Sequence, residues 1–181
     1  MKILFVIDPQ YDFISGSLPV GGAEESMNAL AGYIRRNDGE YDLKIVTADW
    51  HPHDHCSFQE NGGPWPVHCA QFTHGASLYQ PLVEALYGTA GKVVVLTKGT
   101  LADREEYSIM SNEKSRKVIR RIFKKKIVSQ IDVCGIAGDI CVRQTLMDCF
   151  AEFGREKFRV LTDYCPSLDG GTALTELLQN S

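Results

Sequence analysis

Short apolar runs rich in β-branched residues alternate with stretches of helical periodicity along this chain, which limits the folds it can adopt. The apolar runs are nearly continuous, which is typical of strands covered on both faces. They predict strands at Lys2–Asp8, Leu43–Ala48, Lys92–Leu96, Ile131–Ile136 and Phe158–Leu161. The intervening patterns predict helices at Glu24–Arg36, Leu78–Tyr87, Asn112–Lys126 and Val142–Phe153. This alternation indicates an α/β domain with a parallel sheet and right-handed crossovers.

Length and charge narrow the class of protein. The 181 residues fit one domain, 1–181, and the net charge is −4. Residues 114–126 hold eight Lys and Arg and no acid, whereas the rest of the chain holds 11 Lys and Arg against 23 Asp and Glu. This balance argues against a general nucleic-acid-binding protein. We interpret the basic segment as the solvated face of an amphipathic helix, with an anionic partner surface as the alternative.

The sequence also bears on the compartment. The apolar run Ile3–Ile7 is too short for the core of a secretion signal, and nowhere do about 18 apolar residues follow one another. Six cysteines in a chain without a secretion signal are expected to be reduced thiols. We therefore expect a cytoplasmic protein that does not bind a membrane.

Side chains capable of chemistry stand at the predicted carboxyl ends of four strands. Asp8 ends the first strand, Asp49 and His51 follow the second, Lys98 follows the third, and Cys141 follows the fourth after a turn. In an open parallel sheet, ligands bind outside these strand ends. We therefore expect these residues to meet in one site.

Cys141 is the predicted nucleophile, because a thiol at the start of a helix is favoured as thiolate and the helix N–H groups can receive an oxyanion. A small buried hydrophobe is the alternative reading of a lone cysteine. Asp8 at the end of a buried strand needs a partner, and Lys98 can supply it while Asp8 takes the Cys141 proton. A structural ion pair is the alternative for Asp8 and Lys98. The remaining cysteines are expected to be structural: Cys56, Cys69, Cys134, Cys149 and Cys165.

A long irregular segment, residues 49–77, holds all five histidines, and such a loop is usually functional or disordered. Asp49 and His51 lie at positions i and i+2, hence on one side of an extended segment, and His55 and His68 follow. One carboxylate with two or three imidazoles suits Zn²⁺, Fe²⁺ or Mn²⁺ with open positions. Histidines satisfied within the loop are the alternative. Outside this set we expect exposed His53 and His74, with Glu60 as a possible extra ligand.

Several longer motifs resemble those of the isochorismatase-like cysteine hydrolases, and within them the nicotinamidase/pyrazinamidase branch. They extend over nearly the whole chain: Val6–Phe13, Gly16–Val20, Thr47–Pro52, Trp65–Cys69, Lys98–Gly99, Tyr107–Ser108 and Gly135–Val142. The Asp-x-His-Pro and Trp-Pro-x-His-Cys motifs are typical of the metal-containing branch. The resemblance implies a three-layer α/β/α fold with a mainly parallel open sheet of about five to six strands.

The resemblance also implies a catalytic machinery. Asp8, Lys98 and Cys141 would form a triad, and the N–H groups of Ala137 and Cys141 would form an oxyanion hole. The family carries a cis peptide bond at the position of Ile136–Ala137. The implied reaction is hydrolysis of nicotinamide to nicotinate and ammonia in NAD salvage, with pyrazinamide as a second substrate.

The metal and substrate residues follow from the same resemblance. Asp49, His51 and His68 would bind a divalent ion, for which zinc is the first expectation and iron or manganese the alternatives. His55 matches a further metal-associated histidine found in some members. Phe13 and Trp65 match aromatic residues that sandwich the pyridine ring.

Two segments of this sequence depart from the pattern of the family it resembles. The chain stops at Ser181, where family members continue into a further strand, so we expect the sheet to lack an edge strand. Leu101–Glu106 replaces a segment that commonly holds Asp-Ser. Alternative functions are another hydrolase of this fold, acting on isochorismate, a carbamoyl amine or a ureido acid, and a non-catalytic metal-binding or thiol-redox protein. The sequence leaves open the metal, the preference between nicotinamide and pyrazinamide, and whether the protein is a homo-oligomer.

Overall fold

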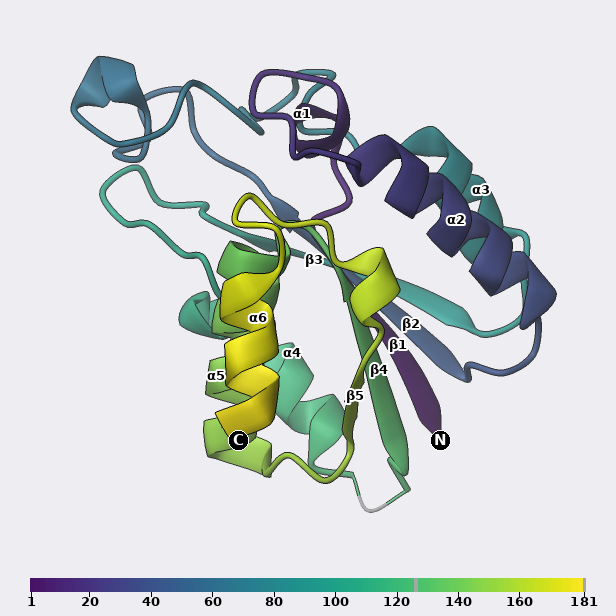
Figure 1. Ribbon diagram of the computed structural model, residues 1–181. Coiled ribbons are helices and arrows are strands. Elements are labelled where there is room, and N and C mark those ends of the chain that lie inside the picture. Colours follow the sequence, from purple (N-terminus) through teal and green to yellow (C-terminus); the bar gives the residue numbers. More distant parts are fainter. Residues whose placement is uncertain (126, 181) are drawn as a thin grey trace.

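The computed structural model describes residues 1–125 and 127–180, and within them a five-stranded, wholly parallel sheet forms the middle of the protein (Figure 1). The strands are β1 (Lys2–Ile7), β2 (Leu43–Asp49), β3 (Lys92–Lys98), β4 (Gln130–Gly135) and β5 (Phe158–Val160). Their spatial order is β3-β2-β1-β4-β5, so the chain leaves β1 first toward one edge and later toward the other. All five predicted strands are confirmed. The order reverses between β1 and β4, where this class of sheet binds its ligands.

Helices cover both faces of the sheet. One face carries α2 (Ala23–Arg36) and α3 (Gln80–Tyr87), and the other carries α4 (Glu113–Phe123), α5 (Arg143–Phe153) and α6 (Thr172–Asn180) (Figure 1). The predicted three-layer α/β/α fold is therefore confirmed. The predictions missed the single turn α1 (Tyr11–Ile14), which is too short to show a period, and α6. Across residues 1–125 and 127–180, no helix has the length and apolar character needed to cross a bilayer.

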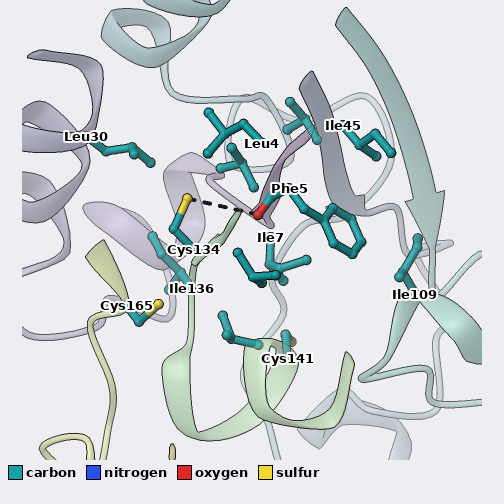
Figure 2. Close-up of a cluster of buried hydrophobic side chains, with 14 of the residues drawn as sticks. Leu4, Phe5, Ile7, Leu30, Ile45, Ile109, Cys134, Ile136, Cys141 and Cys165 are labelled. Carbon is teal, nitrogen blue, oxygen red and sulfur yellow. Dashed lines mark hydrogen bonds between the residues drawn. The ribbon is translucent and has the colours of Figure 1, made fainter. Parts of the chain in front are cut away.

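The central strand explains why the apolar runs are continuous. Every residue from Ile3 to Ile7 has no exposed surface, because helices pack on both sides of β1. Phe5 meets Phe123 of α4 edge to face, with ring centroids 5.6 Å apart. Figure 2 shows Leu4, Phe5 and Ile7 at the centre of this core, with Cys141 approaching it from the segment that leads into α5. Cys141, the candidate nucleophile, thus lies between the hydrophobic core and the carboxyl ends of the strands.

The basic segment forms a surface helix, and its predicted end differs from the observed one. Helix α4 ends at Phe123, and Lys126 lies outside the described residues. The apolar side of α4 is buried through Ile119 and Phe123. On the polar side Arg120 donates to the Glu152 carboxylate of α5 at 2.6 Å. The amphipathic interpretation therefore accounts for this helix.

Candidate active site

Four neighbouring strands bring the predicted residues to one edge of the sheet. In the register of the sheet Asp49 pairs with Lys98 across β2 and β3, and Ile7, which precedes Asp8, pairs with Gly135 across β1 and β4. Cys141 follows Gly135 by six residues on a turn above the same edge. The parallel register is the reason that residues far apart in sequence meet here.

Lys98 lies at the centre of the polar residues at this edge. Its ammonium is 3.0 Å from Asp8 Oδ2, donates to Asp49 Oδ1 at 2.5 Å and lies 3.6 Å from Cys141 Sγ. Asp8 also accepts a hydrogen bond of 2.6 Å from Thr47 Oγ1, which fixes its second oxygen. Lys98 and Asp8 have no exposed surface, and Cys141 retains 6%. The structure therefore brings the three predicted triad residues into one buried cluster.

Burial and the neighbouring charges shift the pKa values of all three groups in this cluster. Burial raises the pKa of Cys141 well above its ordinary value, with Lys98 opposing the shift and the negative charges of Asp8 and Asp49 adding to it. Burial also raises the pKa of Asp8, again against the attraction of Lys98. Burial lowers the pKa of Lys98, but Asp49 and Asp8 outweigh this effect and keep the amine protonated. The ligand atoms of Asp8 and Cys141 lie within 4.8 Å of each other, so an acid and a thiol of raised pKa can exchange one proton beside the Lys98 cation.

The turn before Cys141 differs in detail from the predicted helix start. Gly138–Val142 form one π-helical turn, and α5 begins only at Arg143. The Ile136–Ala137 peptide bond is cis, as the family resemblance implied. The Gly138 N–H donates to Pro166 O at 2.8 Å, so this amide already has a partner. The turn holds the Cys141 sulfur over the end of β4, next to the Lys98 ammonium.

A second cluster lies on the other side of Asp49. Ligand atoms of Asp49, His51 and His68 all lie within 4.8 Å of one another, and the three residues are buried. His51 Nδ1 faces Gly99 O at 3.0 Å, and His68 Nδ1 faces Pro66 O at 2.8 Å, which leaves the Nε2 atom of each ring for a ligand. Within the described residues, the buried His51 Nε2 has no hydrogen-bond partner. Burial lowers the pKa of His68, which favours the neutral imidazole that binds metal ions. A carboxylate with two imidazoles, one of them holding an unsatisfied buried nitrogen, fits a divalent metal ion.

His55 is placed differently from its predicted role. Its Nδ1 lies 2.7 Å from Ser57 Oγ, and its Nε2 lies 3.0 Å from Arg104 O, so both ring nitrogens are engaged. The ring stacks beside His51 with centroids 4.0 Å apart. His55 therefore supports the His51 ring in this structure instead of joining the ligand atoms. The side chain of Glu60 is exposed, and His53 and His74 are exposed as well.

A pocket opens beside both clusters. It is lined by Phe13, Leu18, Val20, Asp49, Trp65, His68, Glu105, Tyr107, Ala137, Ile140, Cys141 and Leu168. The predicted aromatic residues Phe13 and Trp65 are in this set, and the Trp65 Nε1–H donates to Tyr107 Oη at 3.0 Å. Tyr107 and Glu105 also line the pocket, and the sequence assigns a role to neither of them. Neither residue ends a strand or has ligand spacing, so the pattern gave no reason to select it.

Comparison with known proteins assigns the family. The isochorismatase domain family matches residues 2–170, which is most of the chain. The chain belongs to the isochorismatase family. This isochorismatase-family protein is 32% identical to the nicotinamidase of Saccharomyces cerevisiae over 91% of its own length and 87% of that relative.

Solved structures agree with this assignment. The family member described here is similar to the pyrazinamidase of Pyrococcus horikoshii in complex with zinc, with a TM-score of 0.79, 32% identity and coverage of 98% of this chain and 94% of that one. It is also similar to PnC1 from L. infantum in complex with nicotinate, with a TM-score of 0.80, 28% identity and coverage of 99% and 89%. Both likenesses cover nearly the whole chain.

Proposed function

We propose that this protein is a metal-dependent nicotinamidase, a cysteine amidohydrolase that converts nicotinamide and water to nicotinate and ammonia and also accepts pyrazinamide. The observation that carries the proposal is the contact of Lys98 with Asp8, Asp49 and Cys141, because it joins a nucleophile and its base to a buried ligand cluster. The resemblance to nicotinamidases over most of the chain supports the substrate. One catalytic domain in the cytoplasm, with its cysteines reduced, is the form in which we expect it to act.

The first half of the reaction forms a thioester. Asp8 accepts the Cys141 proton while Lys98 stabilises the negative charge that moves from carboxylate to sulfur. The thiolate attacks the carboxamide carbon, and the N–H groups of Ala137 and Cys141 receive the oxyanion. Asp8 returns the proton to the leaving nitrogen, which departs as ammonia when the carbon–nitrogen bond breaks. The products of this half are the Cys141 thioester and a regenerated Asp8 carboxylate.

The second half consumes one water molecule. The water oxygen attacks the thioester carbon while Asp8 accepts a proton from that water. The N–H groups of Ala137 and Cys141 again receive the oxyanion. The carbon–sulfur bond then breaks, and the proton on Asp8 returns to the Cys141 sulfur. Lys98 stays protonated throughout, because its two carboxylate neighbours keep its pKa high.

The pocket orients the aromatic ring. Phe13 and Trp65 are the residues proposed to flank it, and the hydrogen bond to Tyr107 holds the Trp65 indole in place. Asp49, His51 and His68 would hold the metal, and we propose zinc as the ion. When bound, the ion supplies a Lewis acid beside the pocket that can anchor a ring nitrogen.

The test is ammonia release from nicotinamide, with isochorismate, a carbamoyl amine and a ureido acid as competing candidates in parallel assays. We expect turnover of nicotinamide by the zinc-loaded protein, a loss on chelation that zinc restores, and no turnover by Cys141→Ala. Cys149→Ala is the matched control, because Cys149 is a buried cysteine two turns further along α5 and away from the pocket. Normal turnover in Cys141→Ala would contradict the mechanism, and turnover of another candidate in preference to nicotinamide would contradict the substrate.

A further inference from the structure

The turn between β1 and α1 carries a glutamine with a special relation to Asp49. Gln10 has no exposed surface. Its Oε1 accepts the Asp49 N–H at 2.7 Å, and its Nε2 donates to Asp49 O at 2.8 Å. One side-chain amide thus bonds to the backbone groups on both sides of a single residue. Because both the N–H and the C=O of Asp49 are fixed, the direction in which its carboxylate leaves the backbone is fixed as well.

The same Gln10 amide also reaches the far end of the histidine loop. Its Nε2 donates a second hydrogen bond, of 2.9 Å, to Ala76 O. The side chain therefore ties the end of β2 to the segment that closes the loop. All hydrogen-bonding atoms of the Gln10 amide are used in this way, on backbone groups.

Asp12, two residues further on, holds the other half of the loop. Its Oδ2 accepts the N–H of Cys69, the residue after His68, at 2.7 Å. The Cys69 carbonyl in turn accepts the His51 N–H at 3.0 Å. The Asp12 carboxylate thereby fixes the segment that carries His68 and, through one backbone group, the segment that carries His51. The packing is tight enough that a Cβ at Gly75 would lie 2.1 Å from Asp12 Oδ2.

We propose that Gln10 and Asp12 are positioning residues for the metal: they set the geometry of Asp49, His51 and His68 through the backbone. This inference rests on the proposed metal site. The three ligands come from two segments that meet at a single bridge, between His51 and Ala70, and Gln10 and Asp12 each hold one of these segments by hydrogen bonds. The same turn begins at Asp8, so the base and the metal ligands are placed by one piece of backbone.

The test is the zinc dissociation constant of the metal-free protein, measured by competition with a chromophoric chelator. Gln10→Leu keeps the size of the side chain and removes its three hydrogen bonds, and we expect about 10–100-fold weaker zinc binding. The Asp12 carboxylate accepts the N–H groups of Ser17 and Cys69, and Asp12→Asn keeps one acceptor oxygen for the two, so we expect zinc binding to weaken here as well. Saturating zinc should restore a large part of the kcat lost in either variant.

The matched controls lose a similar hydrogen bond far from the site. Gln130→Leu removes an amide that donates to Asp132 at 2.6 Å near the opposite end of β4, and Asp38→Asn alters a carboxylate that accepts the Ala90 N–H at 2.7 Å. We expect wild-type zinc affinity in both. A purely structural role would lower the melting temperature of Gln10→Leu and Asp12→Asn and leave the zinc dissociation constant of the folded fraction unchanged, which would overturn the inference. Should Gln10→Leu fail to fold, Asp12→Asn decides. Absence of zinc binding in the wild-type protein would refute the metal site itself and is thus a distinguishable failure.

Discussion

The Lys98 ammonium lies 3.0 Å from the Asp8 carboxylate, and both side chains are buried. The same ammonium also donates to Asp49, which belongs to the ligand cluster, and touches the Cys141 sulfur. One cation therefore balances two buried carboxylates and links the nucleophile to the proposed metal site. Stability and catalysis should depend on it together.

The Lys98→Met variant should lose both stability and catalytic activity. Without the ammonium, Asp8 and Asp49 become two uncompensated buried carboxylates, so we expect the free energy of unfolding to fall by about 3–5 kcal/mol. Ammonia release should fall to background. Urea unfolding of the metal-free protein measures the first effect. Lys92→Met, at the exposed start of the same strand, should change the unfolding free energy by no more than about 0.5 kcal/mol. Wild-type stability in Lys98→Met would refute the buried network.

Gly99→Ala should displace His51, a proposed metal ligand. Gly99 has a φ of +63°, and a Cβ there would lie 2.3 Å from His51 Cε1. We expect zinc binding to weaken by about 10-fold or more, since the ring must move. Gly62→Ala is the control, because Gly62 also has a positive φ, +85°, yet within the described part of the chain nothing lies within 4 Å of the added carbon. That variant should lose about 1–2 kcal/mol of stability and keep its zinc affinity. Equal zinc affinities in the two variants would be evidence against His51 as a ligand.

Tyr107→Phe should weaken substrate binding more than it slows the chemistry. The variant keeps the ring and removes the oxygen that accepts the Trp65 Nε1–H, so the indole loses its anchor in the pocket wall. An unpaired indole N–H costs about 1 kcal/mol, and we expect KM for nicotinamide to rise about 5-fold with kcat within about 2-fold. Tyr87→Phe, on a side chain that is 63% exposed, should behave as wild type. A fall in kcat with unchanged KM would show that Tyr107 acts on the reacting atoms instead.

Asp132 should govern part of the acid sensitivity of the fold. Burial raises the pKa of its carboxyl, but hydrogen bonds from Arg159, Tyr41 and Gln130 outweigh it and hold the pKa below the ordinary 3.8. The unfolded chain then binds this proton more readily than the folded protein, so the stabilisation is present above about pH 4 and is lost as the pH falls through the lower, folded-state pKa. We expect Asp132→Asn to be less stable at pH 7 and to show a flatter decline between pH 4 and pH 2 in urea unfolding. An unchanged slope in Asp132→Asn would contradict this account.

The fold class and most members of the two clusters follow from the amino-acid sequence. Continuous apolar runs are typical of strands buried on both faces, which holds for β1 and β2 and not for the edge strands β3 and β5. The carboxyl ends of parallel strands meet at one edge. Asp8, Asp49, Lys98 and Cys141 were therefore recognisable from strand ends alone. The histidine loop added His51 and His68 because ligand types and spacing are local properties of a sequence.

The hydrogen bonds between these residues are seen only in the folded protein. In the folded protein Asp49 accepts a hydrogen bond from Lys98 as well as lying beside the histidines. Both ring nitrogens of His55 are engaged, by Ser57 and by Arg104. The Trp65 indole donates to Tyr107. Each of these results depends on which polar atom is nearest after the chain has folded. Hydrogen bonds form over about 3 Å between groups that are often dozens of residues apart, so their pairing follows from packing and leaves no periodic trace in the sequence.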